Sequence, residues 1–200
     1  AKPFTVEQQA ADAAALLDYL GVSSVRVLGL SMGGQAALHL TKSRPQLVAA
    51  LGLANTSLGR GTDGAERRAS VCSEIEQLGW NGYARAYIVS RTVYPDRSSA
   101  VAFEQVMKQM NPACFVEQSV SISRQNVSDA ASQIAVPTLV ASGDRDDSTP
   151  PGVASALAEV IKGADVVTIP DAGHLSVLDQ PAAFAGLFMD FFDRVDSEAL

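Results

Sequence analysis

The sequence has only two histidines and two cysteines in 200 residues, which limits the chemistry open to it. Cys72 and Cys114 lack the spacing of a metal site or a redox pair. We therefore expect free thiols in a reducing compartment, with one disulfide as the alternative. The chain also lacks a phosphate-binding lysine motif and a cluster of metal ligands. These absences predict that the protein uses no metal and no other cofactor.

Basic residues are also scarce. Lysine and arginine total 15 against 22 acidic residues, a formal net charge of −7, and no basic cluster is interleaved with aromatic residues. This balance argues against nucleic acid as a partner. No apolar run is long enough to cross a membrane, so we expect no membrane contact. The expected free thiols fit a reducing compartment, and we therefore expect a cytoplasmic protein. A hydrophobic content of 47% is enough for a sizeable core.

What the chain does have is a glycine-rich corner at residues 29–34, which reads Gly-Leu-Ser-Met-Gly-Gly. A short apolar strand precedes the corner and a helix-forming stretch follows it. A serine at such a turn has a strained backbone and an exposed hydroxyl, and it needs small neighbours, here Gly29 and Gly33. The N–H groups at the start of the next helix face whatever binds there. Ser31 is therefore the candidate nucleophile.

An acid and a histidine follow Ser31 in the chain order that such a nucleophile requires. A buried strand over 136–143 leads into aspartates at 144, 146 and 147, and a second strand over 164–170 leads into His174. Both polar clusters come after the carboxyl end of a strand, which is the edge where sites assemble in open α/β sheets. We therefore expect His174 to reach both Ser31 and one of the three aspartates.

The three segments resemble the α/β-hydrolase superfamily, through the motifs GLSMGG, VPTLVASGDRDDSTP and AGHLSVLDQP. The resemblance runs from the first expected helix to the last. It implies an α/β fold that forms the C-terminal part of an α/β-hydrolase, with a mostly parallel sheet, helices on both faces and a helical lid. In that family the acid commonly lies four residues before the proline of a G-D-x-D-x-x-x-P pattern. This favours Asp146, with Asp147 as the alternative and Asp144 shaping the turn.

Local patterns divide the chain into three parts: core residues 1–54 with the nucleophile, a helical lid over 55–133, and core residues 134–200 with the acid and the histidine. Thr5 and Gln8 suggest a capping box at the start of the first helix, and His39 lies on the helix after Ser31, where we expect a structural role. The expected helices cover 5–20, 31 to about 43, and a stretch from Pro181, and the expected strands cover 25–30, 47–54, 138–142 and 166–169.

Aromatic residues in the lid segment are candidates for contact with the substrate. The resemblance implies that this segment covers the site, and we expect Trp80, Tyr83 and Tyr87, together with Leu30 beside the nucleophile, to line the pocket. The alternative is that the aromatic residues only pack the lid onto the core.

The residue types predict a Ser-His-Asp triad. Serine is a weak nucleophile, so His174 would take the proton of Ser31 while Asp146 orients the imidazole. The backbone N–H of Met32 would stabilise the oxyanion. In this family the second oxyanion donor comes from a loop after an earlier strand, and no such segment occurs in this chain.

A serine at the corner leaves several activities open. Within the superfamily the chain is most similar to 3-oxoadipate enol-lactonase-like hydrolases, through GLSMGG, the residues Leu53-Ala54-Asn55-Thr56 and the run Ser148-Thr149-Pro150-Pro151. The expected substrate is a small ester or lactone. The alternatives are a carbon–carbon bond hydrolase, an acyltransferase, a cofactor-free perhydrolase, or a non-catalytic ligand-binding protein of the same fold.

The strand before Ser31 lies mid-sheet in this family, but here no readable strand precedes it. Residues 25–30 would then form an open sheet edge, which invites pairing. We therefore expect an N-terminal complementary segment, supplied by a second polypeptide, with simple truncation as the alternative.

Overall fold

The computed structural model describes residues 5–198 and contains one sheet of four parallel strands in the order β1-β2-β3-β4. The strands are β1 (Val25–Leu30), β2 (Val48–Ala54), β3 (Thr138–Gly143) and β4 (Asp165–Ile169). Each lies within one residue of its predicted bounds. Leu30 pairs with Ala54, which pairs with Ala141, so the carboxyl ends of the strands are level along one edge.

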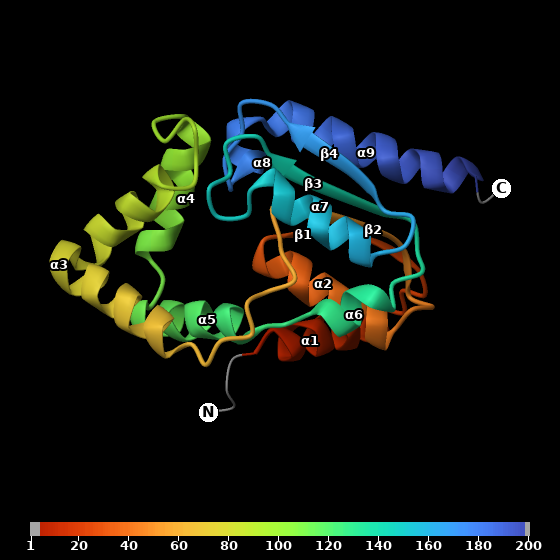
Figure 1. The fold of residues 1–200 in the computed structure, drawn as a ribbon, viewed down its shortest axis with the longest axis horizontal. Helices are drawn as coiled ribbons and strands as arrows, with labels where there is room; N and C mark the ends of the chain where they lie inside the picture. The colour runs from red at the N-terminus through yellow and green to blue at the C-terminus, as the bar shows by residue number, and fades with distance from the viewer. Residues whose placement is uncertain (1–4, 199–200) are drawn as a thin grey trace.

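The two faces of the sheet are covered by different helices (Figure 1). On one face, Leu51 and Leu53 of β2 pack with apolar residues of α2 (Met32–Ser43), α6 (Ser128–Ser132) and α7 (Pro151–Val160). On the other face, Ala50 and Ala54 pack against α9 (Pro181–Glu198). This alternation along β2 is the two-residue period of a strand that is buried on both faces.

Helix α1 (Val6–Tyr19) lies beside α2 and begins as predicted. Thr5 caps it, because its hydroxyl accepts a hydrogen bond from the N–H of Gln8 at 3.1 Å. The reciprocal half of the predicted capping box does not form. The Gln8 amide instead donates to Asp12, one turn further along the helix.

The segment between β2 and β3 is helical, as predicted. It holds α3 (Ala65–Val89), α4 (Ser98–Lys108), α5 (Pro112–Arg124) and α6, and Figure 1 shows α3 to α5 standing to one side of the sheet. Helix α3 is interrupted at Gly79, whose φ of 66° is left-handed. Helix α6 packs against α2 and α7, so it belongs to the core and not to the part that stands apart.

After β4, the chain turns into the short helix α8 (Ser176–Asp179), which leads into α9. As predicted, α9 begins at Pro181 and buries Phe184, Phe188 and Phe191 along one face. Within residues 5–198, no helix is long and apolar enough to cross a membrane.

Candidate active site

Ser31 lies at the corner between β1 and α2, with the unusual backbone angles φ 53° and ψ −118°. The corner is held by two hydrogen bonds: the Ser31 N–H donates to the Ala54 carbonyl at 2.9 Å, and the Thr56 hydroxyl donates to the Ser31 carbonyl at 2.7 Å. A positive φ at a non-glycine residue is costly and occurs where surrounding contacts impose it. The strained strand-to-helix corner predicted from the motif is therefore confirmed.

The glycine positions that have no room for a side chain are not the two that we expected. A Cβ at Gly29 would lie 2.4 Å from the Gly33 carbonyl oxygen, so Gly29 must be small as predicted. A Cβ at Gly33 would have no neighbour within 4 Å, so the prediction for Gly33 was wrong. The crowded position is Gly34, where a Cβ would lie 2.6 Å from the Thr56 methyl group.

Asp146 follows β3 and is 2% exposed. One of its carboxylate oxygens accepts the N–H groups of Ser148 and Thr149 at 2.8 and 2.9 Å. Burial raises the pKa of Asp146, but hydrogen bonds from its neighbours and the attraction of a charged His174 outweigh burial and hold that pKa well below its ordinary range. The carboxylate is therefore ionised and acts only as an acceptor.

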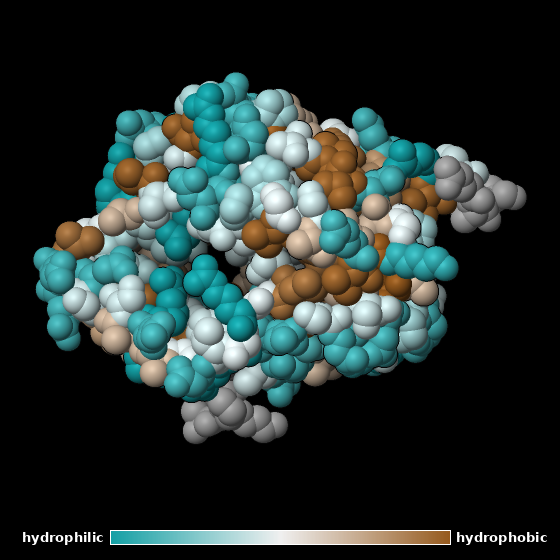
Figure 2. Space-filling view, viewed as in Figure 1, coloured by the Kyte–Doolittle hydropathy of each residue, from teal (hydrophilic) through white to brown (hydrophobic). Residues whose placement is uncertain are grey.

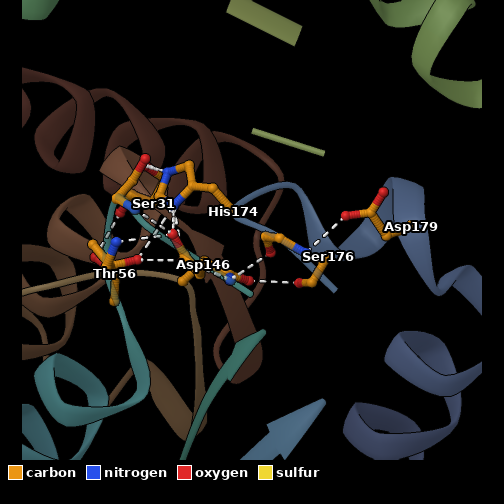
Figure 3. Close-up of polar contacts among 10 residues, drawn as sticks. Ser31, Thr56, Asp146, His174, Ser176 and Asp179 are labelled. Atoms are coloured by element: carbon orange, nitrogen blue, oxygen red, sulfur yellow. Dashed lines mark hydrogen bonds and ion pairs between the residues drawn. The ribbon is translucent and has the colours of Figure 1, made fainter. Parts of the chain in front are cut away.

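His174 connects the acid to the serine. Its Nδ1 lies 3.0 Å from Asp146 Oδ2, and its Nε2 lies 2.9 Å from Ser31 Oγ. Figure 3 shows the three side chains pointing toward one another. Because the Asp146 carboxylate can only accept, the proton on His174 belongs on Nδ1, which leaves Nε2 as an acceptor facing the serine hydroxyl. The predicted meeting of the three residues is confirmed.

The other candidate residues take the places expected of them. Asp144 accepts the N–H of Ala172 at 3.2 Å and so shapes the turn. Asp147 is exposed and makes no contact with His174. His39 lies away from the corner, with its Nε2 3.2 Å from the Gln125 side chain. Cys72 and Cys114 are both free thiols.

Asn55 is a buried polar residue for which the sequence offered no role. It directly follows β2, is fully buried and has a φ of 48°. Its amide nitrogen donates to Asp146 Oδ2 at 2.9 Å and to the Gly173 carbonyl at 3.2 Å, and its amide oxygen accepts the Ser176 hydroxyl at 2.5 Å. Asn55 therefore ties the acid to the loop that carries the histidine.

Asp179 is a second buried residue that the sequence did not reveal. It is 1% exposed, and its carboxylate accepts the N–H groups of Val93, Tyr94 and Gly173 at 2.8 to 3.2 Å. Gly173 is the residue directly before His174. Asp179 thus joins the histidine loop to the segment that follows α3.

A cavity of about 440 Å³ opens between the Ser31–His174 pair and the helical segment that joins β2 to β3. Figure 2 shows a hollow in the surface between these parts. Ser31, His174, Leu30 and Tyr87 all line the cavity.

Trp80 and Tyr83 are not among the residues that line the cavity, so the contact expected for them is not seen. They pack behind the wall against Phe115, with ring centroids 5.5 and 5.6 Å from it. Tyr83 is only 3% exposed, and burial raises the pKa of its hydroxyl. These two residues therefore have a packing role, which was the alternative to contact with the substrate.

Known proteins share this fold. Residues 1–187 match the alpha/beta hydrolase family. The chain belongs to that family. The predicted fold class is thereby confirmed, and the chain is an α/β-hydrolase enzyme.

Three relatives each match nearly all of this chain and about three quarters of their own length. A pimeloyl-[acyl-carrier protein] methyl ester esterase of Neisseria meningitidis is 26% identical, over 98% of this chain and 78% of its own. The enol-lactonase of Burkholderia xenovorans is 27% identical, over 96% of this chain and 74% of its own, with a TM-score of 0.84. A thermophilic esterase from Thermogutta terrifontis is 26% identical, over 96% and 73%, with a TM-score of 0.85.

Proposed function

We propose that this α/β-hydrolase cleaves a carboxylic ester or a lactone through an acyl-enzyme intermediate, with Ser31, His174 and Asp146 as its catalytic triad. The observation that carries the proposal is the position of His174. Its Nε2 is 2.9 Å from the Ser31 hydroxyl, while its Nδ1 is 3.0 Å from a buried, ionised carboxylate. A base held between a nucleophile and an orienting acid is the arrangement that acyl transfer needs.

In the first half of the reaction, Ser31 Oγ attacks the carbonyl carbon of the substrate and His174 Nε2 takes the hydroxyl proton. Asp146 stabilises the imidazolium that forms. When the tetrahedral intermediate collapses, the carbon–oxygen bond to the leaving group breaks and His174 gives its proton to the departing oxygen. In the second half, water attacks the acyl carbon, His174 takes a proton from that water, and the proton returns to Ser31 Oγ as the acid is released.

The Met32 N–H belongs to the first turn of α2 and is the proposed oxyanion donor. Within the described residues β1 pairs only with β2, so the other edge of β1 carries backbone groups without a strand partner. We propose that the complementary strand expected from the sequence pairs at this edge and brings the second donor. Native mass spectrometry of the active protein tests this, and an active species containing only this chain would contradict it.

We further propose that α3 to α5 act as the lid over the cavity. Tyr87, on α3, and Leu30, next to the nucleophile, both line the cavity and would contact the acyl or alcohol part of the substrate. The volume of about 440 Å³ suits a small molecule. Substitution of Leu30 or Tyr87 should change the preference among esters more than it changes the free energy of unfolding.

Covalent labelling tests the proposal most directly. A fluorophosphonate probe should label Ser31 in the wild-type protein, and neither Ser31→Ala nor His174→Ala should react at an appreciable rate. A panel of 4-nitrophenyl esters, lactones and vinylogous diketones then separates ester cleavage from carbon–carbon bond cleavage. If folded protein resists the probe and hydrolyses nothing in the panel, the chain is a binding protein of this fold.

A further inference from the structure

Thr149 is in contact with both the cavity and the buried acid. It lies in the loop between β3 and α7 and is partly buried. Thr149 lines the cavity, as His174 does, whereas Asp146 is 2% exposed and is not among the lining residues. The side chain of Thr149 nevertheless reaches the Asp146 carboxylate, with its hydroxyl oxygen 2.6 Å from Oδ2. Thr149 therefore links the cavity to the acid.

Thr149 donates a hydrogen bond to each oxygen of that carboxylate. Its backbone N–H donates to Oδ1 at 2.9 Å, and its hydroxyl donates to Oδ2 at 2.6 Å. Ser148 adds a second donor to Oδ1, and Asn55 adds a second donor to Oδ2. A carboxylate that is held at one oxygen can still turn about the bond to its Cβ, because that torsion is broad. Donors on both oxygens fix the plane of the carboxylate that His174 meets.

The same hydroxyl also lies beside the imidazole ring. Thr149 Oγ1 is 3.2 Å from Nδ1 of His174, while Asp146 Oδ2 is 3.0 Å from that nitrogen. Because the hydroxyl proton is donated to Asp146, the hydroxyl oxygen keeps lone pairs that can accept from the Nδ1 proton. The Nδ1 proton is therefore shared between two acceptors, as in a three-centre hydrogen bond. The hydroxyl, the carboxylate and the imidazole thus form a closed set of three contacts.

We propose that Thr149 is a positioning residue for the reaction of the triad. Its hydroxyl orients the carboxylate of Asp146 and the ring of His174 together, which keeps Nε2 of that ring directed at the nucleophile. Thr149 acts through these two residues and takes no proton in the reaction. This inference rests on the proposed function, because it adds a residue to the machinery of that same site. A purely structural role would need only the volume of the side chain, whereas positioning needs the hydroxyl.

The test compares Thr149→Val, which keeps the shape but loses the hydroxyl, with Thr149→Ser, which keeps the hydroxyl but loses the methyl group. For a neutral 4-nitrophenyl ester, kcat of Thr149→Val should fall by about tenfold, the effect expected when one hydrogen bond to a charged group is lost. KM should change little, and Thr149→Ser should recover most of the lost kcat. Rates are expressed per site labelled by a fluorophosphonate, so that misfolded protein does not count. If Thr149→Val fails to fold, Thr149→Ala takes its place, since it lacks the hydroxyl without placing a methyl group against the carboxylate.

Thr168→Val is the matched control, because Thr168 is exposed on β4, and its kcat should equal that of wild type. Wild-type kcat in Thr149→Val, or an equal loss in Thr149→Val and Thr149→Ser, would overturn the proposal.

Proton NMR of the His174 Nδ1 proton gives a second readout that does not depend on hydrolysis. The chain has two histidines, so a His39→Gln variant identifies the signal. The signal should shift in Thr149→Val and keep its position in Thr149→Ser, because the hydroxyl lies 3.2 Å from Nδ1. An identical signal in all variants would overturn the proposal. If wild type cleaves no ester but the signal shifts as expected, Thr149 positions the pair and only the hydrolase function is refuted.

Discussion

The side-chain nitrogen of Asn55 lies 2.9 Å from Asp146 Oδ2, although the two residues are 91 positions apart in the chain. They meet because β2 and β3 are adjacent and parallel, so the residues that follow each strand lie at the same edge of the sheet. Asn55 also accepts the hydroxyl of Ser176 at 2.5 Å. One amide thus fixes the acid relative to the loop of His174.

We expect Asn55→Ala to lower both activity and stability. Removal of the amide leaves buried partners without hydrogen bonds, which costs about 1–3 kcal/mol. The value of kcat for a neutral 4-nitrophenyl ester should fall by roughly tenfold, because Asp146 then holds the imidazole less firmly. Urea unfolding and steady-state kinetics measure the two effects.

Asn55→Gly separates the side chain from the backbone. Asn55 has a φ of 48°, which glycine adopts without strain and alanine does not. Both variants should lose activity to the same extent, but the glycine variant should be more stable than the alanine variant by about 1–2 kcal/mol. Wild-type kcat in either variant would show that Asn55 does not position the acid.

The second prediction concerns the identity of the acid. Asp146→Asn should lower kcat by roughly 10⁴-fold, because an amide favours the wrong tautomer of His174. Asp147→Asn is the control, since Asp147 is the exposed neighbour, and its kcat should stay within about twofold of wild type. Similar kcat values for the two variants would mean that Asp146 is not the acid that orients His174.

The convergence of Ser31, Asp146 and His174 could be predicted because each of these residues follows a strand, and the carboxyl ends of neighbouring parallel strands meet at one edge of the sheet. The roles of Asn55 and Asp179 could not be predicted, because they depend on hydrogen-bond partners that are distant in the sequence. The contact of Asp179 with Val93 spans 86 positions. The cavity contact predicted for Trp80 and Tyr83 was wrong for a different reason. The kink at Gly79 and the position of Phe115 decide which face of α3 meets the cavity, and neither is visible in the aromatic pattern.

The third prediction concerns the two glycines after Met32. Gly34→Ala should destabilise the protein by about 1–3 kcal/mol, because its Cβ would overlap Thr56 and disturb the hydrogen bond to the Ser31 carbonyl. Gly33→Ala should cause no loss of stability, as nothing lies within 4 Å of its Cβ. Thermal unfolding of both variants checks this, and an equal loss would show that helix geometry and not Thr56 sets the need for glycine.

The fourth prediction tests Asp179 as a positioning residue. Asp179→Asn weakens charge-assisted hydrogen bonds to three N–H groups and should cost about 3 kcal/mol of unfolding free energy. Because Gly173 precedes His174, kcat should also fall, while KM for a small neutral ester should change little. The exposed Asp190→Asn variant is the control and should match wild type in both measurements. An unchanged kcat in Asp179→Asn would restrict the residue to a role in stability.

The last prediction follows from the lowered pKa of Asp146. The ordinary pKa of this carboxyl is 3.8, and its folded value lies below that. The unfolded state therefore takes up a proton at a higher pH than the folded state does. The resulting stabilisation is fully present above pH 3.8 and is lost as the pH falls through the folded pKa. Asp146→Asn lacks this contribution at every pH.

Urea unfolding of wild type and Asp146→Asn between pH 5 and pH 2.5 measures the effect. The difference in unfolding free energy should be constant down to about pH 4 and should then shrink, with a slope approaching about 1.4 kcal/mol per pH unit for one group. Asp147→Asn should show no such change of slope relative to wild type. A difference that grew on acidification would mean that burial, which raises the pKa, outweighs the hydrogen bonds from Asn55, Thr149 and His174.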